Sequence, residues 1–557
     1  MSQSRFRRPT FWLLAALLLI AAILRVRALD FGLPHTQTRP DETAIIDPVR
    51  TLLSGHLPHF YDYPWLFLWI VSLAYLGYFA WGAMAGTFHS LNEMLASWPV
   101  HWQPFFLIPR VISATVGTLS ILVIYRLGRQ LRDEATGIVS ALFLTFAFMH
   151  ARNSHFGTTD VTMTCLIILA VTLLLDAHRT RSHKRFAAAG LVAGLAAATK
   201  YNAVVLVVPM LASHALTVYE SPGRRREALL DTRILYFGGA FALAFLIGVP
   251  FVILDRASFL KGMADLADAL RVGDTRLDQS NGWWHHLDFS LRYGIGLPLL
   301  VTGLVGAVAM AWLEPRVALL FLSFPVVYYL IAGSFRLLFF RYAMPVVPFL
   351  CVTAAYLVCR AAAWLASRLS APVGQRTVFR TATALFAIAI VWSSAIRIWA
   401  FNDLLGREDN RVVVARWFFE HVPPGSSVLQ SGSRYGLVQF WDRQFAYREW
   451  RWDGRNEMFL LNGRHTEPSD RPEWIIVQHS PLPSATQPIV KQFLKEDYTL
   501  VADFKAFSEA DDLVFEQQDA FFVPYSGFDH VVRPGPNFSV YKRGHADLRP
   551  AAESVGP

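Results

Sequence analysis

Long apolar runs dominate the first 400 residues of the chain. A helix needs about 20 mostly apolar residues to cross about 30 Å of hydrocarbon, and twelve runs reach or approach that length. They are centred in 10–27, 64–86, 105–127, 136–150, 160–176, 186–199, 202–217, 234–253, 293–312, 316–334, 341–359 and 380–399. The pattern predicts an all-α polytopic membrane domain over residues 1–400.

Basic residues between the runs predict how the helices thread. Lys and Arg excess marks short cytoplasmic loops, because positive charge resists translocation. Such loops occur at 126–132, 178–185, 223–226 and 360–380, and the amino terminus is also basic. All of these basic segments lie on the cytoplasmic side only if one of the early apolar runs does not cross the membrane. We expect the aromatic-rich stretch 64–86 to lie at the outer interface or to re-enter, which leaves about eleven spans.

No small-residue cleavage site follows the first apolar run, so we expect an uncleaved first span. The amino terminus is then inside and the carboxyl terminus outside, in a multi-pass protein of the plasma (cytoplasmic or inner) membrane.

The pattern changes from about residue 401. A helix that begins at Asp409 or Asn410, a Pro-Gly turn and a strand are predicted first. A strand at 473–480, a helix at 489–498 and a strand at 499–507 follow. Alternation of this kind predicts one extracytoplasmic α/β domain over residues 401–557.

Composition supports a membrane protein and excludes a disordered chain, a disulfide scaffold and a cytosolic enzyme. The 557 residues are 54% hydrophobic and 17% charged, whereas soluble domains carry about 25% charged residues. The net charge of +9 comes largely from the predicted inner loops, so it does not indicate a nucleic-acid partner. Cys165, Cys351 and Cys359 lie in apolar runs and predict packing rather than disulfides or metal binding. The small-residue run 190–198 is typical of closely packed helices.

On this threading, sparse polar residues from distant parts of the chain converge on the outer face. They are Asp41, Glu42, Arg152, His155, Asp160, Lys200, the loop 255–292, Arg336 and Arg341. Ionisable groups at spans are usually paired or functional. The alternative for the basic ones is that they snorkel at helix ends. Asp41 and Glu42 are adjacent, so on a helix they point different ways and would have different roles; alone, such a pair is commonly solvated surface.

Several of these segments resemble a known family. The acidic pair after the first span is followed by YPWLFLW, FLIPRVISATVGTLSILVIYRLGRQL, RNSHFGTTDVTMT, GLAAATKYNAVVLVVP and FRYAMPVVPFL. Their order and spacing over residues 10–400 resemble the GT-C superfamily of membrane glycosyltransferases, nearest to bacterial relatives of protein O-mannosyltransferases and of the lipid A aminoarabinose transferase. RVVVARWFFEHVPPGSSV resembles the extracytoplasmic appendage of such members. The insertion between about 64 and 104 is longer than the family pattern.

The resemblance implies transfer of a sugar from a polyprenyl-phosphate donor to a hydroxyl on a protein, lipid or polysaccharide acceptor at the outer membrane face. The family's first-loop Asp falls on Asp41, with Glu42 beside it, and its second acidic position falls on Asp160. Lys200, Arg336 and Arg341 match basic positions. Some relatives use a divalent metal and others do not, so a metal that Asp41 or Glu42 shares with His285 and His286 stays an open alternative.

The chemistry of a lipid-phosphate donor fits these residue types. The leaving phosphate needs charge compensation more than a proton, so one general base and several cations suffice. We therefore expect Asp41, with Glu42, to act as base and the transfer to invert the anomeric carbon. Asp160 and His155 would position the acceptor or the loop, and Arg336, Arg341 and Lys200 would bind phosphate. Arg152, Tyr201 and Tyr342 complete the predicted substrate-binding set.

Competing interpretations are a lipid or sugar transporter (a flippase) and a sensor whose outer domain binds a ligand. No inverted repeat or matching pair of broken helices favours a transporter. His285, His286 and Asp288 form a possible metal group, but adjacent histidines diverge on a helix, so an interfacial aromatic loop is favoured.

Overall fold

The computed structural model describes residues 4–98, 100–273, 281–369, 374–441, 447–453, 458–461, 464–467, 470–480, 486–516 and 521–544. The chain divides into two compact units. The first unit is Met1–Leu29 with Ala44–Trp399, and the second is Asp30–Thr43 with Ala400–Pro557. Two of the boundaries between the units fall within helices, namely α2 (Pro40–Leu53) and α20 (Gln375–Leu405).

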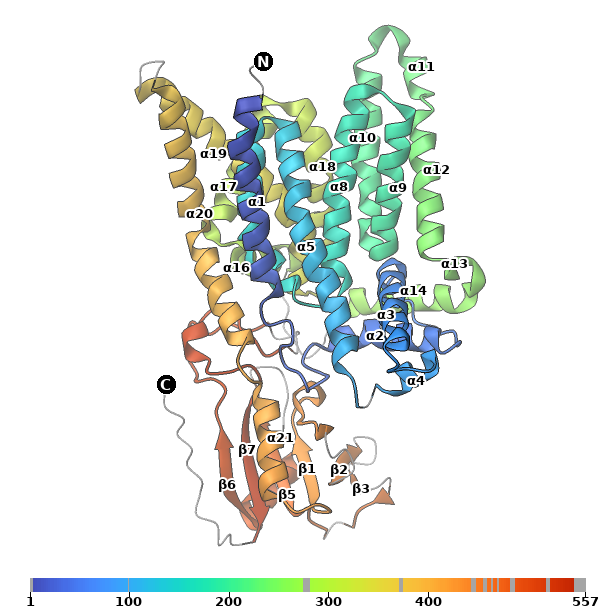
Figure 1. Ribbon diagram of the computed structural model, residues 1–557, viewed down its shortest axis with the longest axis vertical. Helices are drawn as coiled ribbons and strands as arrows, with labels where there is room; N and C mark the ends of the chain where they lie inside the picture. Colours follow the sequence, from blue (N-terminus) through green and yellow to red (C-terminus); the bar gives the residue numbers. More distant parts are fainter. Residues whose placement is uncertain are drawn as a thin grey trace. The chain divides into compact units, whose positions relative to one another are not determined.

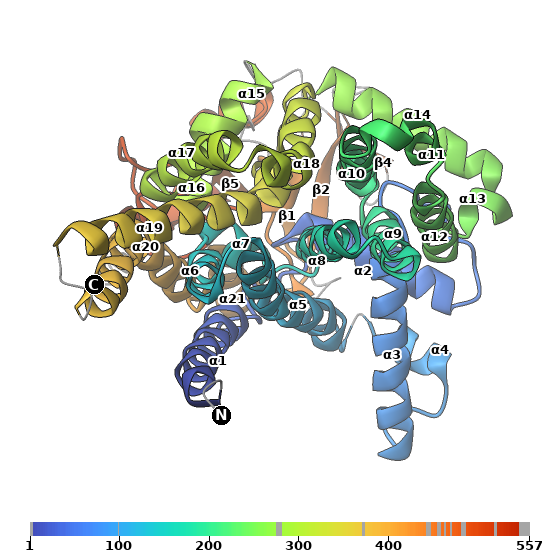
Figure 2. The ribbon, with the colours of Figure 1, turned by 90° about the horizontal axis from the view of Figure 1, so that it is seen from above.

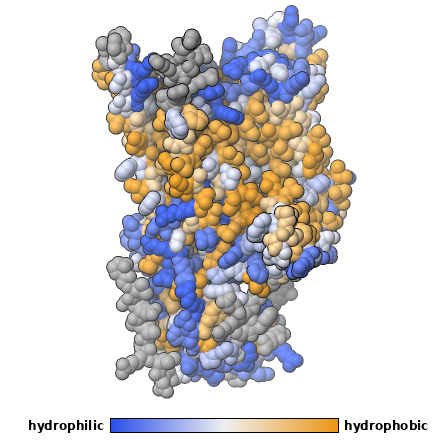
Figure 3. Space-filling model, in the orientation of Figure 1, coloured by the Kyte–Doolittle hydropathy of each residue, from blue (hydrophilic) through white to orange (hydrophobic). Residues whose placement is uncertain are grey.

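The first unit is a bundle of apolar helices (Figures 1 and 2). Its longer helices besides α20 are α1 (Ser4–Val26), α3 (Leu66–Met84), α5 (Gln103–Leu131), α6 (Glu134–Thr145), α8 (Thr159–Thr180), α9 (His183–Thr199), α10 (Val207–Tyr219), α12 (Arg233–Gly248), α14 (Arg256–Val272), α17 (Leu297–Leu313), α18 (Pro315–Gly333) and α19 (Val347–Leu369). α8 packs between α5 and α9, and α9 packs against α12. Hydrophobic residues cover the middle of these helices, and hydrophilic ones gather towards their ends (Figure 3).

Short helical segments join the long helices. They are α4 (Leu91–Ala96), α7 (Phe148–Asn153), η1 (Tyr201–Leu206), η2 (Pro222–Arg224), α11 (Arg225–Leu229), α13 (Phe251–Leu254), α15 (Gly282–His285), η3 (His286–Leu291), α16 (Arg292–Ile295) and η4 (Phe340–Val346).

Glycines in α9 allow the close helix packing that the small-residue run predicts. A Cβ at Gly190 would overlap the carbonyl of Phe237 in α12, and one at Gly194 would overlap the carbonyl of Phe241. Only a residue without a side chain lets the two backbones approach this closely. The α9–α12 contact therefore depends on the glycine spacing in α9.

Eight helical segments within the described residues are long and apolar enough to cross a membrane, or nine if one bent pair counts as a span. The predicted count of eleven is not confirmed. Two predicted runs form shorter apolar helices, Thr10–Val26 within α1 and Glu134–Thr145, and a third forms the 17-residue α9. The stretch 64–86, which was expected not to cross because of the loop charges, forms α3. By length and hydropathy α3 is one of the eight candidate spans.

The second unit contains a seven-stranded sheet in the order β4-β3-β2-β1-β5-β7-β6. β1 (Ser427–Ser431) runs parallel to β2 (Arg448–Asp453) and to β5 (Trp474–His479). The other pairs are antiparallel. They involve β3 (Met458–Leu461), β4 (Arg464–His465), β6 (Tyr498–Phe504) and β7 (Asn537–Arg543).

One helix covers each face of the sheet. Alternate residues of β1 and β5 face α21 (Asn410–His421) or α22 (Pro488–Glu496). Val428 and Ile476 belong to the hydrophobic cluster that contains Phe418 of α21. Leu429 and Ile475 belong to the cluster that contains Phe493 of α22. A strand buried on both faces needs a continuous apolar run, which β5 has.

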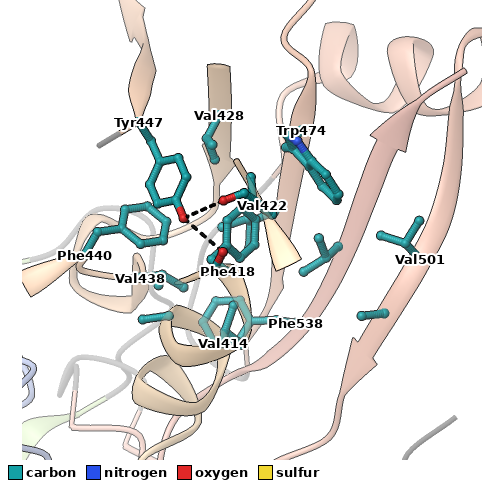
Figure 4. Close-up of a cluster of buried hydrophobic side chains, with 14 residues drawn as sticks. Val414, Phe418, Val422, Val428, Val438, Phe440, Tyr447, Trp474, Val501 and Phe538 are labelled. Atoms are coloured by element: carbon teal, nitrogen blue, oxygen red, sulfur yellow. Dashed lines mark hydrogen bonds between the residues drawn. The ribbon is translucent and has the colours of Figure 1, made fainter. Parts of the chain in front are cut away.

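Figure 4 shows the first of these clusters. The Tyr447 hydroxyl donates to the carbonyls of Phe418 and Val422 at 2.9 and 3.2 Å. It thereby supplies a hydrogen-bond donor to backbone carbonyls at the carboxyl-terminal end of α21.

The sequence-predicted elements of this unit are confirmed. α21 begins after Asp409, whose side chain accepts a hydrogen bond from the Arg411 amide as an N-cap. β1, β5, α22 and β6 follow in the predicted order. Strands β2, β3, β4 and β7 were not predicted. β2 and β4 carry charged residues that interrupt an apolar pattern, β3 is an apolar stretch of only four residues, and β7 ends in Lys542 and Arg543.

Candidate active site

Asp160 lies in the first turn of α8, immediately after the segment 150–159. A helix amino terminus carries a partial positive charge, which favours a carboxylate there. The Asp160 side chain is nevertheless only 3% exposed. A carboxylate buried to this degree requires further compensation.

Lys200 supplies part of that compensation. α8 and α9 are neighbouring helices joined by a turn in which Arg181 has a φ of 55°. The beginning of α8 therefore lies beside the end of α9, which Lys200 terminates. Lys200 Nζ is 2.5 Å from Asp160 Oδ1.

Arg341 reaches the same carboxylate from a third part of the chain. It lies in η4, and its Nε is 3.8 Å from Asp160 Oδ2. The guanidinium also lies over the Phe339 ring, with Cζ 4.2 Å from the ring centroid. One buried carboxylate between two cations gives this trio a formal charge of +1.

Tyrosines next to the two cations hold these segments together. Lys200 Nζ lies 5.2 Å from the ring centroid of Tyr342. The Tyr342 carbonyl accepts a hydrogen bond from Tyr328 of α18, and the Tyr328 hydroxyl accepts one from Asn202 of η1, at 3.1 and 2.7 Å. Tyr328 and Asn202 were not predicted as site residues, because Tyr328 lies in an apolar run and Asn202 in a short turn after α9.

Arg152 and His155 lie in the segment that leads to Asp160. Both side chains are buried. The His155 ring nitrogen Nδ1 is 3.0 Å from the Ala151 carbonyl oxygen, so this histidine ties the segment to α7. The Arg152 guanidinium lies 6.0 Å from the Phe148 ring.

Arg336 is placed differently from Arg341. Its side chain is exposed, and its amide donates to the Leu270 carbonyl of α14 at 2.9 Å. The described contacts that join Asp160, Lys200 and Arg341 do not include Arg336.

A second polar cluster lies beside Tyr201. The Tyr201 hydroxyl donates to the Tyr61 carbonyl at 3.1 Å. The Tyr61 hydroxyl and His59 Nδ1 approach one oxygen of Asp255, at 2.5 and 2.7 Å. The hydrogen bond from Tyr61, followed by that from His59, lowers the pKa of Asp255 to about 2. The aromatic YDYPW stretch was the signal that could have identified Tyr61.

Asp41 and Glu42 belong to the second unit, in the segment Asp30–Thr43, here called loop one. Arg39 Nη2 is 2.8 Å from Asp41 Oδ2. The Asp41 side chain is 25% exposed, whereas Glu42 is fully buried. The two neighbouring carboxylates thus have different environments, with Asp41 accessible and held by a buried arginine.

The described residues contain no group of three or more His, Cys, Asp or Glu side chains able to hold a metal ion. His286 contacts Ser290 at 3.0 Å, and Asp288 pairs with Arg292. The Asp41 carboxylate is already bonded to a guanidinium. These donor sets do not fit a metal centre within the described part of the chain.

Residues 107–253 match the family model described as dolichyl-phosphate-mannose-protein mannosyltransferase. This segment includes Asp160 and Lys200. A comparison with curated proteins found no match.

Among solved structures, ArnT from Cupriavidus metallidurans bound to undecaprenyl phosphate is similar at a TM-score of 0.54, with 14% identity and 100% of both chains covered. The oligosaccharyltransferase of Archaeoglobus fulgidus in its apo form aligns at a TM-score of 0.52, with 12% identity over 97% of this chain and 89% of that one. AglB from the same organism, in complex with an inhibitory peptide and a dolichol-phosphate, aligns at 0.50 and 14% identity over 80% of this chain. This chain covers 64% of that AglB chain. These likenesses confirm the resemblance seen in the sequence: the chain is a multi-pass membrane protein with the fold of the GT-C glycosyltransferases.

Proposed function

We propose that this protein is an inverting glycosyltransferase that moves a sugar from a polyprenyl-phosphate donor to a hydroxyl acceptor. The observation that carries the proposal is the buried trio of Asp160, Lys200 and Arg341. Two cations among apolar helices provide what a lipid-linked phosphate needs: positive charge and several hydrogen-bond donors.

Lys200 and Arg341 bind the donor phosphate, and Asp160 orients both. Its two oxygens contact one cation each, which restricts the positions that the ammonium and guanidinium can take. Donors fixed before the reaction stabilise the charge that develops on the leaving phosphate. Tyr342 lies beside Lys200, whose Nζ is 5.2 Å from the ring centroid, and Tyr201 follows Lys200 in the chain. Arg152 and His155 are buried in the segment that leads to Asp160. Arg336 is left out of the phosphate site because, among the described residues, its side chain is not one of those that contact Asp160.

Asp41 is the general base. The Arg39 guanidinium, 2.8 Å from Asp41 Oδ2, holds this partly exposed carboxylate in place. Asp41 accepts the proton of the acceptor hydroxyl, whose oxygen bonds to the anomeric carbon while the bond to the phosphate oxygen breaks. The phosphate leaves with the electron pair, so no acid is required, and attack opposite to it inverts the anomeric centre. Glu42 supports the loop from its buried position.

The reaction takes place at the outer face of the cytoplasmic membrane, with the amino terminus inside and the second unit outside. The acceptor is a hydroxyl of a protein, lipid or polysaccharide. The structures of similar fold bound to undecaprenyl phosphate and to a dolichol-phosphate support a polyprenyl-phosphate ligand.

The test is transfer from an isotope-labelled polyprenyl-phosphate sugar in membranes that contain the protein. We expect label in the acceptor fraction with the wild type and none with Asp41→Asn at equal expression. Asp47→Asn, the same change farther along α2 at a 61% exposed side chain, should keep full transfer. Movement of intact donor across the membrane without bond cleavage would instead identify a transporter, and full activity of Asp41→Asn would remove Asp41 as the base.

A further inference from the structure

Loop one is part of the second unit although it lies near the amino terminus. Residues Asp30–Thr43 and Ala400–Pro557 form one compact body. The segment that carries the proposed base Asp41 is therefore packed together with the α/β domain.

Polar contacts fasten loop one to the segment after β1. The Thr36 amide and hydroxyl both donate to Gln439 Oε1, at 2.8 and 3.1 Å. One residue earlier, His35 Nε2 lies 2.7 Å from the Leu437 carbonyl oxygen. His35 is 1% exposed, so this contact is protected from water. Three hydrogen bonds thus fix two consecutive residues of loop one.

Phe521 contacts loop one at two places, near its beginning and next to Asp41. Phe521 is 1% exposed and packs edge-to-face on Phe31, with ring centroids 5.4 Å apart. The Arg39 guanidinium lies 5.9 Å from the same ring. Phe521 therefore supports the arginine that binds Asp41.

The segment that carries Gln439 is itself held by the sheet. Gln430 of β1 accepts from the Val438 amide at 2.8 Å and donates to the Val438 carbonyl at 3.0 Å. Val438 and Phe440 are buried in the cluster under α21. Gln439 lies between these two buried residues, so its backbone position is set by the sheet rather than by loop one.

We propose that the α/β domain is a positioning element of the reaction, with Gln439 and Phe521 as positioning residues that hold loop one and Asp41 in the reactive geometry. This inference rests on the function proposed above. A displacement of a catalytic group by about 1 Å can reduce the rate about 100-fold, so the attachment of loop one to the sheet has a direct effect on catalysis.

Gln439→Leu tests the polar anchor, because it removes the acceptor with little change in side-chain volume. We expect kcat to fall about tenfold or more, with the KM for donor within about twofold. Gln439→Glu keeps an acceptor for both Thr36 donors and should restore most of kcat. Gln492→Leu makes the same change on the exposed face of α22 and should leave kcat unchanged. Wild-type kcat in Gln439→Leu, or an equal loss in Gln492→Leu, would overturn the proposal.

A readout independent of activity separates this inference from the proposed function. Hydrogen exchange at the Thr36 amide of the full-length protein should accelerate about fivefold in Gln439→Leu, as expected from loss of a hydrogen bond worth about 1 kcal/mol, and stay unchanged in Gln492→Leu. Unchanged exchange in Gln439→Leu would contradict the anchor itself. If Asp41→Asn kept full transfer while exchange responded as expected, the role of Asp41 would fail and the anchor would stand.

Discussion

At the scale of single residues, the candidate site depends on how buried charges are compensated. Asp160 and Arg341 are 3% and 6% exposed, and Lys200 is 13% exposed. Charged groups leave water at a high cost unless partners replace the lost hydration. The same ion pairs that hold α8, α9 and η4 together thus keep two cations in place for an anionic ligand.

Lys200→Met should therefore affect stability as well as transfer. Removal of one member of a buried ion pair costs about 3–5 kcal/mol, because the remaining charge loses its partner. We expect the unfolding midpoint of the purified protein to fall accordingly, together with loss of transfer. Lys261→Met, on the exposed side of α14, is the matched control and should change neither. Equal midpoints for the two variants would show that the Lys200–Asp160 pair contributes little.

His35 predicts an acid-sensitive loop one. Burial, and then the nearby Arg411 guanidinium, lower its pKa from 6.5 to about 3, against opposing effects of Asp409 and the Leu437 carbonyl. The unfolded chain binds a proton below pH 6.5 while the folded chain keeps His35 neutral. The contribution is therefore complete above pH 6.5 and is lost as the pH falls towards 3, by about 1.4 kcal/mol per pH unit.

Hydrogen exchange of loop-one amides between pH 7 and pH 4, corrected for the intrinsic rate, measures this loss. Protection should decrease towards acid in the wild type. His35→Gln keeps a donor for the Leu437 carbonyl without a titrating ring, so its protection should depend less on pH. The same pH dependence in both proteins would exclude His35 as the cause.

The sequence could predict Asp160, Lys200 and Arg341 because charged residues stand out in an apolar background. It could not separate Arg341 from Arg336, since both occur in the same short stretch. Only η4 directs Arg341 towards Asp160, while a backbone hydrogen bond keeps Arg336 at α14. Arg39 was missed because it lies in a polar loop, where such a residue has no distinguishing pattern. The aromatic stretch around Tyr61 is a signal, but it does not indicate a contact with Asp255, which is far away in the sequence.

At the scale of elements, hydropathy predicts apolar helices well and their bends poorly. Residues Gly282–Ile295 and Leu297–Leu313 meet at an angle of 115°. Gly296, at the bend, has a φ of 80°, which favours glycine, and Pro298 lies in the first turn of the next helix. The apolar run continues through this point, so the length of the run does not reveal the bend. This is one physical reason why the span count differs from the prediction.

Close packing of α5 against the segment before Asp160 gives a prediction at this scale. A Cβ at Gly157 would lie 2.8 Å from Pro109 Cβ and 3.3 Å from the Arg110 amide nitrogen. Gly157→Ala should displace the segment, at a cost of about 1–3 kcal/mol for overpacking. Because Asp160 follows three residues later, we also expect transfer to fall at least about tenfold.

Gly238→Ala is the control for that substitution. It lies within α12, and no heavy atom comes within 4 Å of the added Cβ. Alanine is favoured over glycine in a helix by about 1 kcal/mol, so this variant should be as stable as the wild type or more so, with normal transfer. If both glycine variants behaved alike in unfolding and transfer assays, close packing at Gly157 would have no special role.

At the scale of the whole molecule, the sequence predicts the helical bundle and the α/β domain, but not which segments of the chain belong to each. The apolar bundle and the α/β domain are visible in the hydrophobic pattern because each element carries its own periodicity. The assignment of Asp30–Thr43 to the second unit is not visible. Contacts such as that between Thr36 and Gln439 join residues far apart in sequence and leave no local pattern.

The lipid-phosphate ligand makes a prediction for the whole protein that needs no acceptor or sugar. A ligand that binds only the folded state at 100 times its Kd stabilises it by about 2.7 kcal/mol. Undecaprenyl phosphate should therefore raise the unfolding midpoint of the purified protein, whereas undecaprenol, which lacks the phosphate, should raise it much less. Arg341→Ala should lose most of the shift, because it removes one of two proposed phosphate ligands. Arg316→Ala, an exposed arginine of α18, should retain it. An equal shift with the alcohol would mean that the lipid chain alone is recognised, and an undiminished shift in Arg341→Ala would place the phosphate elsewhere.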